Sequence, residues 1–64
     1  MSWEEALQAM REGKRVKNKH FCDGEWFEMH KGSLYAEDGC SMYGWYTGES
    51  WQKTGWSIIQ ADRP

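Results

Sequence analysis

The sequence predicts an α+β fold: an N-terminal helix, then a small, mostly antiparallel β-sheet, with a short helical turn before the last strand. Two observations predict this class. The first dozen residues carry a helix signature, and the rest divides into short segments separated by glycine-containing turns. With 64 residues, the chain has room for one compact domain, 1–64, and we expect residues 60–64 to form a polar tail.

The N-terminal segment has both a start and a stop signal for a helix. Ser2 is a favourable N-cap, and Glu5 follows three residues later, which is the pattern of a capping box. Apolar residues then recur at helical spacing and predict one buried stripe, formed by Trp3, Ala6, Leu7 and Met10. Gly13 suits the left-handed position that ends a helix.

The strands are predicted from alternation and turn residues. We expect strands at 14–21, 25–30, 33–36, 41–46 and 56–59, with a short helix through 50–53. Lys31-Gly32 is a plausible two-residue hairpin turn. In the first strand Val16 is expected to point inward, while Arg15, Lys17 and Lys19 point outward.

The aromatic content is high for so short a chain. Five Trp, three Tyr and two Phe exceed what a core of this size buries easily, so some rings are expected at a surface, a subunit interface or a ligand pocket. We expect Trp3, Trp51 and Trp56 in the core and Trp26 as a candidate for a wet interface. A homo-oligomer, dimer or tetramer, would cover the surplus.

The charge is unevenly distributed along an acidic chain. Five of the eight Lys and Arg lie within nine positions, although the formal net charge is −2; they are Arg11, Lys14, Arg15, Lys17 and Lys19. This favours a small phosphorylated ligand over a long nucleic acid. A solvated strand edge protected by lysines remains the alternative. We expect a cytoplasmic protein with reduced thiols and no membrane contact, since no apolar run of membrane length is present.

The residue patterns for catalysis or metal binding are weak. His20, Cys22, His30 and Cys40 do not have the spacing of a zinc finger or ribbon, and nothing orients Cys22 as a nucleophile. We therefore expect no catalytic residue, no metal and no cofactor, and a protein that is not an enzyme.

Both ends of the chain resemble a phage-encoded family. At the N-terminal end the resemblance lies in Trp3-Glu4-Glu5-Ala6-Leu7 and Gly13-Lys14-Arg15-Val16. At the other end it lies in Trp45, a turn with Thr and Ser, a short helix and Trp56-Ser57-Ile58-Ile59. The family is that of Thoeris anti-defence protein 2. Departures lie at residues 20–24, where the family has Gly-Trp-Asn-Gly, and at Gly55, where it has Asp. Members of this family are homo-oligomers that sequester cyclic ADP-ribose-type immune signals between protomers without cleaving them.

The resemblance implies a function and a set of ligand-binding residues. It implies that the protein sequesters a cyclic nucleotide or cyclic ADP-ribose isomer inside an infected bacterial cell. Phe21 and Trp45 match the pocket-lining aromatics of the family. Residues beside them in sequence complete the expected site: Lys17, Asn18, Lys19, Thr47 and Ser50. That Phe21 and Trp45 are instead core or interface rings is an open alternative.

A second function fits the same composition. Acidic charge with exposed aromatic rings also suits a phage inhibitor that binds a host defence protein directly. The two hypotheses differ in partner, because a sequestering protein takes a small molecule whereas a direct inhibitor needs a broad protein surface.

Overall fold

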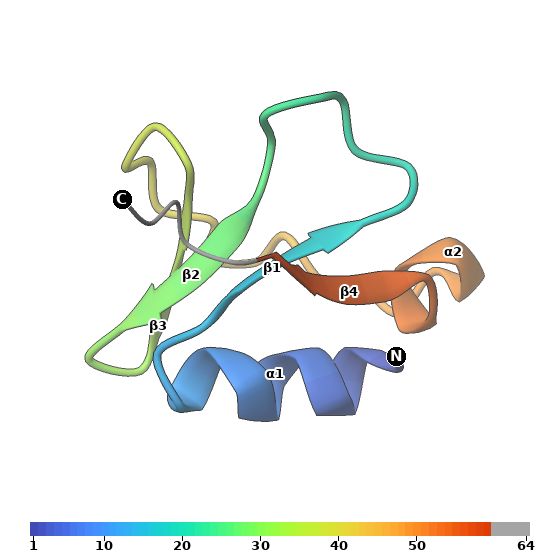
Figure 1. Ribbon diagram of the computed structural model, residues 1–64, viewed down its shortest axis with the longest axis horizontal. Helices are drawn as coiled ribbons and strands as arrows, with labels where there is room; N and C mark the ends of the chain where they lie inside the picture. The colour runs from blue at the N-terminus through green and yellow to red at the C-terminus, as the bar shows by residue number, and fades with distance from the viewer. Residues whose placement is uncertain (60–64) are drawn as a thin grey trace.

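The computed structural model describes residues 1–59 and has the expected α+β fold. Figure 1 shows the elements in chain order: α1 (Trp3–Arg11), β1 (Arg15–Asn18), β2 (Phe27–His30), β3 (Ser33–Ala36), α2 (Ser50–Lys53) and β4 (Trp56–Ile59). The helix, the antiparallel sheet and the short helix before the last strand are all confirmed. The tail expected at 60–64 lies outside the described residues.

Helix α1 is closed at both ends by its own hydrogen bonds. The Glu5 amide donates to Ser2 Oγ at 3.1 Å, and the Ser2 amide donates to Glu5 Oε1 at 2.8 Å, so the expected capping box is present. At the other end Gly13 has φ +90°, and the Lys14 amide donates to the Ala9 carbonyl at 3.0 Å. This is a Schellman arrangement, and it redirects the chain into β1.

The four strands form one antiparallel sheet in the order β3-β2-β1-β4. β2 and β3 are joined by Lys31 (φ 53°) and Gly32 (φ 80°), whose positive angles are those of a type I′ turn, as the sequence predicts. β4 pairs with β1 through the register Val16↔Ile58 and Asn18↔Trp56, so the last strand closes the sheet beside the first.

Three expected strands differ from the observed ones. Residues 41–46 form no strand, since only a single bridge between Ser41 and Tyr35 is present. A turn from Met42 to Trp45 interrupts this segment, with the Trp45 amide donating to the Met42 carbonyl at 2.9 Å. β1 stops at Asn18 and β2 starts at Phe27, so both are shorter than expected.

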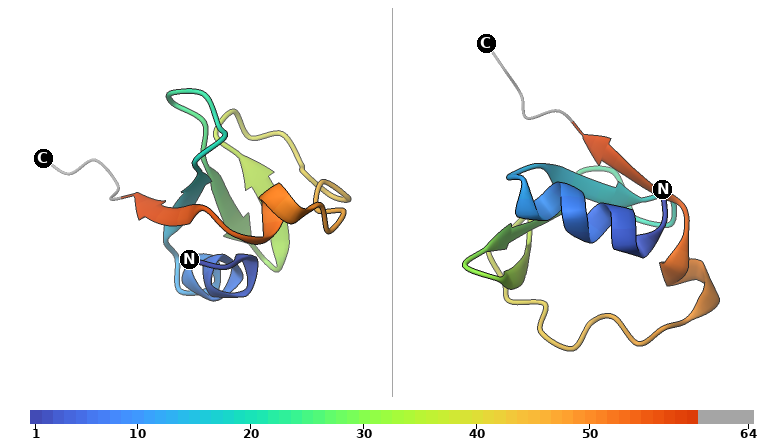
Figure 2. Two further views of the ribbon diagram at one scale, coloured as in Figure 1. Left: turned by 90° about the vertical axis from the view of Figure 1, so that its right-hand side faces the viewer. Right: turned by 90° about the horizontal axis from the view of Figure 1, so that it is seen from below.

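The core lies between α1 and one face of the sheet. The views in Figures 1 and 2 show α1 across that face and α2 beyond one end of the sheet. The buried apolar side chains are Trp3, Ala6, Ala9, Met10, Val16, Phe27, Ala36 and Trp56. Trp3 and Trp56 are therefore core residues, as expected. Trp51 is not, because it is 40% exposed on α2.

Candidate functional site

The sheet has one face that no helix covers within residues 1–59 (Figure 2). Residues that alternate with the buried ones point to this side, which we call the uncovered face. The strand register aligns a row of side chains across it, with Arg15 opposite Ile59 and Glu28 opposite Tyr35. Arg15 and Glu28 join the two halves of the row through an ion pair of 3.6 Å between Nε and Oε1.

Arg15 is held in a defined position on the uncovered face. Its guanidinium carbon lies 4.1 Å from the centre of the Trp26 ring, a cation–π contact. Glu28 lies against the same guanidinium, and its Oε2 also lies 3.0 Å from Nε2 of His30. The Arg15 side chain keeps 38% of its surface exposed. An arginine fixed by a ring and a carboxylate retains N–H groups that can bind two oxygens of an anion at a reduced entropy cost.

The expected ligand residues of β1 fall on two opposite faces. Lys17 is exposed on the uncovered face, whereas Asn18 is 1% exposed and faces the core. The Asn18 Nδ2 donates to the carbonyls of Trp51 (3.3 Å) and Thr54 (3.0 Å), and its Oδ1 accepts the His20 amide (3.0 Å). Both amide hydrogens are therefore committed inside the protein. Asn18 joins β1 to the α2 segment and is not placed to touch a ligand.

Lys19 remains exposed, beyond the end of β1. Its aliphatic stem packs beside Gly55, where an added Cβ would lie 3.1 Å from Lys19 Cγ. Gly55 also has φ +84°, a conformation that glycine adopts readily. In addition, a larger side chain at this position would press against the Lys19 stem.

Phe21 and Trp45 belong to an aromatic cluster beside the core. They meet edge to face with centroids 6.0 Å apart, and both contact Phe27 and Trp56. Trp45 also packs against Trp3 on α1. Both rings are only partly buried. They lie on the side of the sheet that α1 covers, so one protomer does not combine them with Lys17.

Thr47 and Ser50 are both exposed, but Thr47 is already engaged. Its amide and its Oγ1 donate to Gln52 Oε1 at 3.0 and 3.1 Å, and the Glu49 amide donates to the same oxygen at 3.0 Å. Gln52 Nε2 in turn donates to the Trp45 carbonyl at 3.1 Å. The buried Gln52 amide, which sequence reasoning did not single out, therefore holds residues 45–49 in place.

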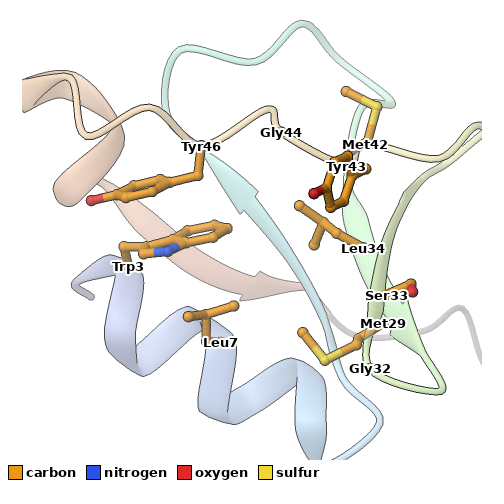
Figure 3. Close-up of a pocket in the computed structure, with 10 residues that line it drawn as sticks. All are labelled: Trp3, Leu7, Met29, Gly32, Ser33, Leu34, Met42, Tyr43, Gly44 and Tyr46. Carbon is orange, nitrogen blue, oxygen red and sulfur yellow. The ribbon is translucent and has the colours of Figure 1, made fainter.

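A second feature is an apolar groove of about 330 Å³ between α1, the β2–β3 hairpin and the loop after β3 (Figure 3). Its walls are mainly Trp3, Leu7, Met29, Leu34, Met42 and Tyr46. Trp3 and Tyr46 stack with centroids 4.6 Å apart and planes inclined by 3°. The ten lining residues include no charged side chain. Such a groove suits an apolar or aromatic group rather than a phosphate.

Cys22 and Cys40 are free and exposed. A side-chain hydrogen bond with Asp38, and then the charge of that carboxylate, raise the pKa of the Cys40 thiol. A raised pKa keeps the thiol protonated and weakly nucleophilic. Within residues 1–59, no cluster of three His, Cys, Asp or Glu side chains could hold a metal ion.

Comparisons with protein-family models, curated proteins and solved structures found no match for this chain. In the part of the chain that the structure describes, no helix combines the length and apolarity needed to cross a membrane. The function is therefore inferred from the fold and from two surface features, the uncovered face and the groove.

Proposed function

We propose that this protein binds a small phosphorylated ligand, of the cyclic nucleotide or cyclic ADP-ribose type, and holds it without cleaving it. The single observation that carries the proposal is Arg15, fixed between Trp26 and Glu28 on the uncovered face, with the exposed Lys17 beside it. A nucleotide needs a cation for its phosphate and an aromatic surface for its base. Here both chemistries occur on one face.

The charge of this surface favours an anion despite the acidic chain. Arg15 and Lys17 contribute two positive charges against the one negative charge of Glu28. His30 adds a further positive charge when it is protonated. The Glu28 carboxylate costs some attraction for a phosphate, but it also fixes the guanidinium. The balance suits a ligand with one or two phosphates rather than a long polyanion.

The resemblance to Thoeris anti-defence protein 2 supports the same class of ligand. We propose on this basis that the protein serves a phage by removing an immune signal in the cytoplasm of an infected bacterium. The site that we propose differs from the one that the resemblance implies. Lys17 remains part of it, whereas Phe21 and Trp45 pack beside the core and Asn18 lies within it.

The first test is thermal unfolding of the purified protein with a panel of cyclic nucleotides and cyclic ADP-ribose isomers. A ligand that binds only the folded state stabilises it by about 4 kcal/mol at a thousandfold excess over its Kd. Compound recovered intact after denaturing the complex would support sequestration, and compound recovered as a hydrolysis product would contradict it. A panel without any shift would instead favour direct binding to a host protein.

Replacing Arg15 with alanine is expected to weaken binding of the active compound at least tenfold. The change removes the charge and the guanidinium fork, and one charge-assisted contact is worth about 1.5 to 3 kcal/mol. Isothermal titration calorimetry measures the loss. Arg11→Ala is the matched control, because Arg11 is an exposed arginine at the end of α1. If the Arg15 and Arg11 variants bind the compound with equal affinity, the uncovered face is not the binding site.

A further inference from the structure

Glu28 lies in the middle of the uncovered face. Arg15 flanks it on the β1 side through the ion pair of 3.6 Å, and Tyr35 is its partner in the register with β3. His30, two residues further along β2, shares the same face, because alternate residues of a strand point to one side. The Glu28 side chain keeps 26% of its surface exposed. A partly buried carboxylate therefore stands between a cation and an aromatic ring.

The Glu28 carboxylate can accept hydrogen bonds beyond the contacts that hold it. The 3.6 Å between its Oε1 and Arg15 Nε exceeds the usual length of a hydrogen bond, so this contact is an ion pair. Its Oε2 lies 3.0 Å from His30 Nε2. An ionised carboxylate offers about four lone-pair sites on its two oxygens. Acceptor sites beside a fixed cation suit a ligand that carries a hydroxyl close to its phosphate.

The order of the side chains across the uncovered face matches the order of the parts of a nucleotide. The register Val16↔Phe27 sets Arg15 opposite Glu28, and Glu28 is in turn opposite Tyr35. Cation, carboxylate and ring thus follow one another on neighbouring strands, which are about 4.8 Å apart. In a nucleotide the ribose lies between the phosphate and the base. The Tyr35 ring is partly exposed, and a base can stack on such a ring.

We infer that the ligand of the uncovered face is a 3′,5′-cyclic ribonucleotide and that Glu28 selects it through its 2′-hydroxyl. In such a molecule the 2′-hydroxyl is on the carbon next to one that carries the phosphate, so donor and anion are neighbours, as Glu28 and Arg15 are. A hydroxyl that donates to a carboxylate forms a short, strong hydrogen bond, and acidic side chains bind ribose hydroxyls at other nucleotide sites. The inference rests on the proposed function and narrows its ligand to one class.

The charge of the uncovered face also fits this class. Arg15 and Lys17 supply two positive charges and Glu28 one negative charge, which leaves one positive charge when His30 is neutral. A 3′,5′-cyclic phosphate is a diester with a single negative charge, whereas the pyrophosphate of a cyclic ADP-ribose carries two. A cyclic mononucleotide therefore neutralises the face without an excess of either sign.

Two matched compounds test the selection: 3′,5′-cyclic AMP and its 2′-deoxy analogue, which differ only in that hydroxyl. We expect the protein to bind the ribo compound at least tenfold more tightly, because a hydrogen bond to a charged group contributes about that much to affinity. Titrations followed by nuclear magnetic resonance measure both dissociation constants, and the shifts of the Arg15 and Glu28 amides locate the site. Equal affinities at this site would overturn the inference and leave the proposed function standing.

Glu28→Met tests the residue itself. Methionine has a similar length but is only a weak acceptor, so the preference for the ribo compound should nearly disappear. The 2′-deoxy compound should bind the variant at least as tightly as it binds the wild type, because a negative charge beside its phosphate has been removed. Glu4→Met is the matched control and should keep the preference, since Glu4 is an exposed carboxylate on α1. Circular dichroism establishes that both variants fold.

Three outcomes would contradict the selection by Glu28. If Glu28→Met weakens both compounds equally, Glu28 acts only by positioning Arg15. If the variant keeps the full preference with unchanged affinities, another group binds the hydroxyl. If neither compound binds the wild type, the ligand is not a 3′,5′-cyclic ribonucleotide, and an unfolding shift with another phosphorylated compound would then support the proposed function alone. The comparison of the two compounds on the wild type does not depend on the folding of any variant.

Discussion

Replacing Trp56 with alanine is expected to leave a large part of the protein unfolded at 25 °C. Trp56 is 2% exposed, and its ring lies 5.0 Å from Trp3 and 5.6 Å from Phe21, centroid to centroid. Its Nε1 also donates to the carbonyl of Gln52 at 2.6 Å. The substitution removes the ring that joins α1, β4 and the aromatic cluster. Truncating a buried tryptophan costs about 3–5 kcal/mol, and a domain of this size has only about 3–10 kcal/mol in total.

The measurement is urea unfolding followed by far-ultraviolet circular dichroism. Trp51→Ala is the matched control, since this tryptophan is 40% exposed on α2 and its loss should cost well under half as much. Its ring contacts only His20 and Trp45 among the described aromatic pairs. If the Trp56 variant unfolds at the same urea concentration as the Trp51 variant, the inference that Trp56 is central to the core is wrong.

The fold was largely predictable because its signals are local. The capping box at Ser2, the Lys31-Gly32 turn and the final strand at Trp56 each depend on residues close in sequence, and all appear in the structure. The failure at 41–46 has a physical cause as well. This apolar, aromatic run reads as a strand, but Gly44 adopts φ +80° and turns the chain. The aromatic side chains at 45 and 46 then pack over Trp3 instead of extending the sheet.

The candidate site was harder to predict, because residues that are neighbours in a strand have side chains on opposite faces of the sheet. Lys17 and Asn18 were expected in one pocket, yet neighbouring strand residues point to opposite faces. Since Val16 was expected to point inward, the two-residue period of a strand already predicted that Asn18 points inward too. The contact between Arg15 and Trp26 joins β1 to the segment before β2, and no short-range pattern reveals such a contact. It follows from the strand register, which only the fold supplies.

Asn18→Asp is expected to be strongly destabilising, although it exchanges only one side-chain nitrogen for an oxygen. The substitution replaces an amide nitrogen, which donates to two carbonyls, with an oxygen that repels them. These two hydrogen bonds are partly buried, and a buried acceptor left unpaired costs about 1–3 kcal/mol. A buried charge without a partner adds to this cost. The loss should therefore exceed 3 kcal/mol at neutral pH, measured as a decrease in the free energy of unfolding.

The pH dependence of that loss identifies its cause. Burial raises the pKa of the new carboxyl in the folded state above its unfolded value of about 3.9. The folded variant then binds its proton more tightly than the unfolded chain does, so stability falls as pH rises from about 4 through the folded-state pKa. Below pH 4 the acid is neutral in both states, and the difference from the wild type should be smallest. Ser57→Asp is the matched control: it adds a carboxyl at an exposed position paired with Lys17 on β1, and its stability should show no such decline. A loss in Asn18→Asp that is the same at pH 4 and pH 7 would mean that the new carboxyl reaches solvent, and that Asn18 is not the internal link between β1 and the α2 segment.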